Sequence, residues 1–198
     1  MNVKEVAEVF GSLTKAQEII LLLNNVKPVV RQGFYEEELK LVEAFCQQNN
    51  LFFTKSTFKI LLDDKERYSN KGQQIQEHDP RRGLYFVYIS KEELKSWLAN
   101  YFELVNNHRE LGGLLGYPEC CIEFFCRNFN EHNTNLELPL TNPYTNLSKR
   151  EEDMVLLSHF PCSSNCPKSI ELAQQYVAVL RKVDQKRAEE LLMSLQRN

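Results

Sequence analysis

The sequence predicts an α+β fold, with a small three-stranded sheet in the first half and a mostly helical second half. Aromatic and β-branched runs at 51–54, 57–62 and 84–89 predict the strands. Capping patterns and apolar periodicity predict six or seven helices, and the last of them is expected at 167–195. A small α/β layer followed by a helical half is the alternative arrangement.

The length of 198 residues fits a single domain over 1–198. Within it, 1–107 is expected to hold helices plus the sheet, and 108–198 is expected to be a helical half that carries most of the cysteines. Helices are expected at 3–10, 14–25, 35–49, 90–107 with a continuation over 108–115, 118–129, 148–158 and 167–195.

Composition and charge limit the function classes. Hydrophobic residues make up 42% and charged residues 26% of the chain, which is ordinary for a globular protein. The formal net charge of −3 argues against a general nucleic-acid binder or a membrane-surface protein, since both rely on a basic excess. The longest apolar run, 19–23, is too short to span a bilayer, and no secretory signal is visible at the N-terminus. We therefore expect a cytoplasmic protein.

A polar segment of about twenty residues, 63–83, separates two of the predicted strands. Segments of this length without secondary structure are usually functional or disordered. A solvated excursion is the simpler interpretation, and a lid over a binding site is the alternative.

Two short segments contain five of the six cysteines and are rich in glycine and proline. In the first, Pro118 is expected at the first position of a helix, which places Cys120 and Cys121 in the first turn. In the second, Cys166 precedes Pro167 and is expected to cap the last helix. Helix N-termini present free N–H groups and a partial positive charge, and both stabilise a thiolate. The two helix starts are therefore predicted to meet at one site.

In a reducing compartment, clustered cysteines more often bind metal or react than form disulfides. The candidate metal ligands are Cys120, Cys121, Cys162 and Cys166, which can satisfy an iron–sulfur cluster or zinc. Adjacent helical residues point about 100° apart, so the doublet is expected to suit a larger body such as a cluster better than one small ion. Otherwise one of the two would ligate while the other packs or reacts.

Two other functions are compatible with the same residues. In a metal-free thiol enzyme, a doublet cysteine such as Cys121 would be the nucleophile, His159 its base, and Cys162 or Cys166 the resolving thiol. In a non-catalytic interaction module, the cysteines would be buried or would hold a structural metal. No complete catalytic constellation is visible, so whether the protein is an enzyme stays open, with His159 and Cys121 as the candidate catalytic residues. A small molecule or a modified nucleotide would be the substrate of an open site.

The remaining cysteines, Cys46 and Cys126, lie on apolar helical stripes and are expected to pack in the core.

The motifs LLGYPxCCxxFF at 114–125 and HFPCSxxC at 159–166 resemble those of an uncharacterised, largely archaeal family, catalogued as domain of unknown function number 483. The matching stretches are 112–126 and 158–169, and the flanking helices follow the same pattern. The resemblance implies a shared cysteine site. It supplies no activity and no catalytic roles.

Overall fold

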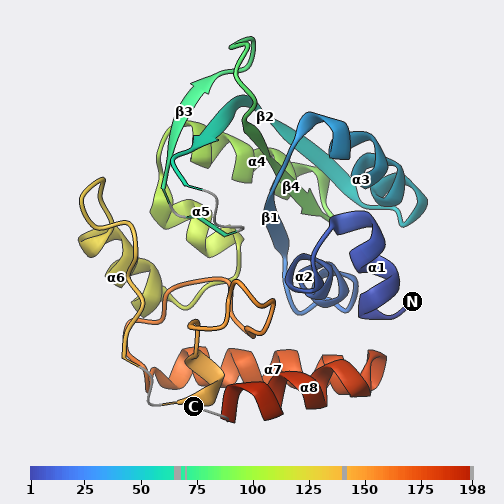
Figure 1. The fold of residues 1–198 in the computed structure, drawn as a ribbon, viewed down its shortest axis with the longest axis vertical. Coiled ribbons are helices and arrows are strands. Elements are labelled where there is room, and N and C mark those ends of the chain that lie inside the picture. The colour runs from blue at the N-terminus through green and yellow to red at the C-terminus, as the bar shows by residue number, and fades with distance from the viewer. Residues whose placement is uncertain (65–67, 70, 140–141, 197–198) are drawn as a thin grey trace. The chain divides into compact units, whose positions relative to one another are not determined.

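The computed structural model describes residues 1–64, 68–69, 71–139 and 142–196. The chain forms two compact units, one made of Met1–Val26 with Tyr117–Asn198 and the other of Lys27–Gly116. The described residues contain eight α-helices and a four-stranded sheet, which confirms the α+β prediction (Figure 1). None of the described helices has the length and apolar character needed to cross a bilayer. The single-domain prediction is not decided by the division into units and stays a prediction.

The unit Lys27–Gly116 is built on an antiparallel sheet with the strand order β1-β4-β2-β3. The strands are β1 (Val29–Phe34), β2 (Phe52–Leu62), β3 (Gly72–Gln76) and β4 (Leu84–Ser90). Its helices are α3 (Glu36–Gln48), α4 (Glu93–Leu104) and α5 (His108–Leu114). The strand β4 is almost wholly apolar and lies between two neighbours, as expected for a central strand buried on both faces.

The predicted count of three strands is wrong, because the sheet has four. The predicted strands at 51–54 and 57–62 form one strand, β2, with an irregular register between Lys55 and Lys59. The strand β1 escaped prediction because Pro28 and Gly33 are residue types that usually mark turns. The strand β3 lies inside the segment predicted as a loop, and its sequence GQQIQ lacks the usual strand residues. An edge strand with one exposed face tolerates that composition.

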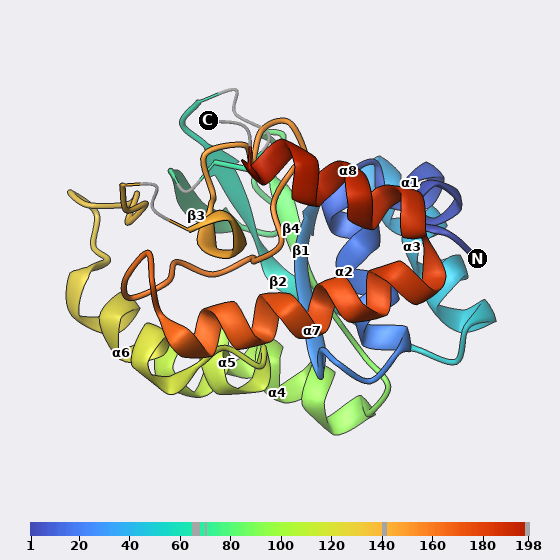
Figure 2. The ribbon, with the colours of Figure 1, turned by 90° about the horizontal axis from the view of Figure 1, so that it is seen from below.

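The other unit contains five α-helices and one short 3-10 helix in its described residues. They are α1 (Val3–Phe10), α2 (Leu13–Leu23), α6 (Glu119–Asn128), η1 (Pro143–Thr145), α7 (Pro167–Val183) and α8 (Gln185–Gln196). Figures 1 and 2 show α7 and α8 side by side, and α2 packs against α7. The apolar faces of these helices meet in a core that includes Ile19, Leu180 and Leu191, all fully buried.

The helix predicted at 148–158 is absent, and that segment forms turns. Asp153 adopts a left-handed backbone conformation, with φ of 61°, which interrupts a helix. Its buried carboxylate accepts hydrogen bonds from the Ser12 hydroxyl at 2.8 Å and from the N–H groups of Leu13 and Thr14 at 3.4 Å. A role in capping α2 therefore overrides the helix propensity of the local sequence.

The helix predicted at 167–195 is two helices that separate at Asp184. The backbone of Asp184 leaves the helical region, with φ of −149° and ψ of 80°. Its carboxylate accepts the N–H of Arg187 at 3.1 Å, which caps α8, and the N–H of Val3 at 3.1 Å, which is the first residue of α1. One aspartate thus serves two helix starts.

Candidate metal centre

The first half of the site is the start of α6. Gly116 has φ of 77°, a conformation that favours glycine, and it turns the chain into Pro118. Pro118 is the N-cap, one position earlier than predicted, and its carbonyl accepts the N–H of Cys121 at 2.9 Å. Cys120 and Cys121 therefore lie in the first turn of the helix, as expected from the sequence.

The second half is the start of α7. Cys166 is the N-cap and Pro167 is the first helical residue, as predicted. The carbonyl of Cys166 accepts the N–H of Ile170 at 3.0 Å, and its own N–H donates to the carbonyl of Ser163 at 3.1 Å. This turn brings Cys162, which precedes the helix by five residues, back toward its start.

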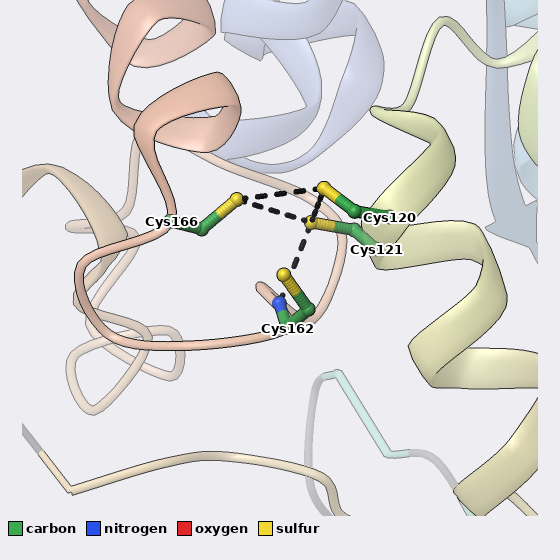
Figure 3. Close-up of side chains that lie close together, drawn as sticks. All are labelled: Cys120, Cys121, Cys162 and Cys166. Carbon is green, nitrogen blue, oxygen red and sulfur yellow. Dashed lines mark hydrogen bonds between the residues drawn. The ribbon is translucent and has the colours of Figure 1, made fainter.

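The sulfur atoms of Cys120, Cys121, Cys162 and Cys166 all lie within 4.8 Å of one another (Figure 3). Cys166 Sγ is 3.7 Å from Cys120 Sγ and 3.7 Å from Cys121 Sγ, and the two doublet sulfurs are 3.9 Å apart. All four cysteines are free thiols. The doublet was expected to share one small ion poorly because adjacent helical residues point apart, but its two sulfurs lie at the same distance, 3.7 Å, from Cys166 Sγ.

A buried hydroxyl contacts the cluster. The hydroxyl of Ser169 lies 3.2 Å from Cys121 Sγ and 3.0 Å from Nε2 of His159. The backbone N–H of Cys162 also donates to Cys121 Sγ, at 3.4 Å. Ser169 is fully buried, and His159 is 7% exposed with its ring centroid 4.9 Å from that of Tyr117. Cys121 Sγ therefore has two hydrogen-bond donors beside it, a hydroxyl and a backbone N–H.

The sequence identified His159 but not Ser169. His159 is not part of the four-sulfur set and reaches it through the Ser169 hydroxyl. One signal could have revealed Ser169: it lies three residues after the N-cap Cys166, so both face the same side of the first turn of α7. The catalytic roles suggested for His159 and Cys121 stay predictions.

Burial and hydrogen bonding give the thiols different acidities. Burial raises the pKa of Cys121 above its usual range and raises the pKa of Cys162 to about 11. At Cys166 burial also acts to raise the pKa, but hydrogen bonds from the Ser169 hydroxyl and N–H and from neighbouring thiols lower it to about 7. Near neutral pH the metal-free cluster thus holds protons that a cation can replace.

The two remaining cysteines behave differently from each other. Cys46 is fully buried in α3, and burial raises its pKa to about 12, so its predicted packing role is confirmed. Cys126 is exposed, and its predicted burial is wrong. The second half of α6 is covered on its Phe125 side, where that ring stacks on Phe129 and Phe160, and this leaves Cys126 outside.

The fold and the site together define an α+β protein with four cysteines gathered at two helix N-termini. A comparison with protein-family models matches residues 96–195, just over half of the chain, to a protein family of unknown function, DUF483. The chain belongs to this family, as the motifs indicated. The matched region contains both cysteine motifs. No curated protein and no solved structure matches the chain significantly.

Proposed function

We propose that Cys120, Cys121, Cys162 and Cys166 bind one Zn²⁺ ion, which ties the starts of α6 and α7 to the segment before α7. The observation that carries this proposal is the spacing of the sulfur atoms. In a tetrahedral zinc site with bonds of about 2.3 Å, the sulfurs are about 3.8 Å apart. Three of the sulfur pairs here are separated by 3.7, 3.7 and 3.9 Å.

The same spacing favours a single ion over an iron–sulfur cluster. A cluster inserts several irons and sulfides between the thiolates, so its ligands surround a larger body than one tetrahedral ion. Here the four sulfurs lie within 4.8 Å of one another. Four thiolates also complete the coordination of zinc, which is the arrangement typical of structural sites.

The surroundings suit the charge of such a site. Four thiolates around Zn²⁺ carry a net charge of −2, and the N-termini of α6 and α7 offset part of it. A thiolate has no proton to donate, so the Ser169 hydroxyl must donate to Cys121 Sγ. That hydroxyl has one hydrogen, and therefore Nε2 of His159 must carry the proton that it donates to Ser169.

A metal-free thiol enzyme is the second candidate. The low pKa of Cys166, about 7, favours a thiolate near neutral pH, and this sulfur lies 3.7 Å from Cys120 Sγ. A thiolate beside a thiol is the arrangement of a reactive dithiol pair. The cytoplasmic location and the small-molecule or modified-nucleotide substrate expected from the sequence remain part of either proposal.

The test is metal analysis of protein purified without oxygen, followed by an absorption spectrum. We expect one zinc per chain and no visible colour, and Co²⁺ in its place should give the strong thiolate-to-metal absorption of a tetrahedral four-sulfur site. Cys121→Ser and Cys166→Ser should each lower the zinc content, and Cys126→Ser is the matched control that should keep it. Brown protein with several iron atoms per chain would show that the site binds an iron–sulfur cluster and not zinc. Metal-free protein with one fast-reacting thiol would favour the enzyme.

A further inference from the structure

The four cysteines of the cluster differ in their access to solvent. Cys121 and Cys166 are 2% and 1% exposed, and Cys162 is half-buried. Cys120 is exposed, although its sulfur lies within 4 Å of two other cluster sulfurs. A reactant arriving from solvent therefore meets Cys120 first.

The hydrogen bonds are distributed in the opposite way. Cys121 Sγ has the Ser169 hydroxyl at 3.2 Å and the Cys162 N–H at 3.4 Å. Within the described part of the chain, the partners recorded for Cys120 Sγ are other cluster sulfurs, with neither a hydroxyl nor an N–H among them. A hydrogen bond draws electron density from a thiolate, so Cys120 Sγ keeps more available lone pairs than Cys121 and Cys166, which both accept from Ser169.

We propose that Cys120 is a metal-activated nucleophile that accepts an alkyl group from a soft carbon electrophile. This inference rests on the proposed zinc site, because zinc holds the bound thiol deprotonated at neutral pH. The net charge of −2 on the zinc and its four thiolates adds to the reactivity of the exposed sulfur.

In the proposed step, a lone pair of Cys120 Sγ attacks the carbon and forms a C–S bond. The bond from that carbon to its leaving group breaks, and the leaving group departs with the electron pair. No oxidant or reductant is needed. The thiolate becomes a thioether, the net charge of the site changes from −2 to −1, and the sulfur becomes a weaker ligand for zinc. The substrate class is an alkyl donor, and one chain accepts one alkyl group.

Cys126 provides an internal control, since it is exposed on the same helix and lies outside the cluster. The experiment loads the full chain with zinc, measures the metal content, and then adds limiting iodoacetamide. Peptide mass mapping follows the alkylation of each cysteine over pH 6.5 to 8.5. The Cys126→Ser variant should keep the fast reaction and lose the slow one.

We expect Cys120 to be alkylated first, at a rate that changes less than about twofold over this pH range, because zinc fixes it as a thiolate. An ordinary free thiol reacts only through its thiolate fraction, so Cys126, which lies outside the cluster, should be alkylated more slowly than Cys120. If the chain holds zinc but Cys120 reacts no faster than Cys126, or slows in parallel with it, the inference is overturned. If the chain takes up no metal, the proposed zinc site itself is wrong.

Discussion

The two compact units of this protein differ in the interactions that hold each of them folded. In Lys27–Gly116, three pairs of antiparallel strands join through backbone hydrogen bonds, which depend little on which side chains are present. In the other unit, residues 129–166 contain a single short 3-10 helix among their described positions. Its backbone hydrogen bonds are short-range turns, and side chains make longer-range contacts, as in the hydrogen bond from the Thr145 hydroxyl to the carbonyl of Ser164 at 2.5 Å.

Further fixed points in 129–166 are also made by side chains. Lys149 Nζ donates to the carbonyl of Ser194 at 2.7 Å, and the Arg187 guanidinium donates to the carbonyl of Asp153. Cys162, as a member of the cysteine cluster, is a further fixed point of this segment. A segment held by few side chains should be more sensitive to single substitutions than the sheet, and the sheet should not respond to metal.

Metal removal should show the largest difference between the units. A chelator should unfold or loosen the region around 158–170 and the start of α6, because a ligand at 1,000 times its dissociation constant stabilises the folded state by about 4 kcal/mol. Acid should act in the same direction, since protons compete with zinc for the thiolates. Hydrogen exchange with mass spectrometry would check this, and the strands β2 and β4 should keep their protection. Equal loss in both units would contradict the comparison.

Asp153→Ala should have the next largest effect. It removes a buried acceptor for the Ser12 hydroxyl and for two N–H groups of α2, at a cost of about 3 kcal/mol in the free energy of unfolding. Chemical denaturation would measure it. Asp153→Asn keeps an acceptor oxygen and tolerates the left-handed backbone, so it should cost less. Glu152→Ala, at an exposed neighbouring position, is the matched control, and a similar loss there would rule out the capping explanation.

Ser56→Ala probes the sheet where the register between β2 and β4 is irregular. The Ser56 hydroxyl is buried, donates to the carbonyl of Phe58 at 2.6 Å and accepts the N–H of Phe86 at 3.1 Å. Its removal leaves the part-buried N–H of Phe86 without this partner, which costs about 2 kcal/mol. We expect lower stability with unchanged zinc affinity. Thr57→Ala, exposed on the same strand, should change stability by less than about 0.5 kcal/mol.

Ser169→Ala should have the smallest effect. Unlike Ser56→Ala, it should change zinc affinity. It removes the hydroxyl next to Cys121 Sγ and should weaken zinc binding about tenfold, since outer hydrogen bonds contribute on this scale. Competition with a coloured chelator would measure the affinity. The Co²⁺ form should also show a shifted thiolate absorption, which a purely structural role would not produce. Ser163→Ala, in the exposed turn before Cys166, should leave both unchanged.

The local features of the site could be predicted from sequence. Pro118 and Pro167 identified the two helix starts, the first to within one residue, and the N-cap position of Cys166 was correct. What the sequence did not show was the contact between elements far apart in the chain. Ser169 gains its role only because Cys121, 48 residues earlier, lies beside it. Whether the sulfurs of Cys120 and Cys121 belong to one site likewise depends on where the sulfurs of Cys162 and Cys166 lie.

The errors in the fold have the same origin. Local propensity favoured a helix through 148–158 and an unbroken helix through 167–195. Asp153 and Asp184 end or prevent those helices because each carboxylate caps another helix through a long-range hydrogen bond. The polar edge strand β3 forms because β2 offers it a partner, which its own residues do not reveal. Contacts distant in sequence decide each case.

The separation of the two cysteine pairs along the chain has a consequence for how the length of this protein can vary. The bound ion would close a loop of 41 residues, from Cys121 to Cys162, and the entropy of closing such a loop is about 3 kcal/mol. That cost grows only with the logarithm of loop length, so doubling the loop adds about 0.6 kcal/mol. Insertions between the two motifs should therefore cost little stability. One extra residue between Cys162 and Cys166, in contrast, would move a ligand out of place.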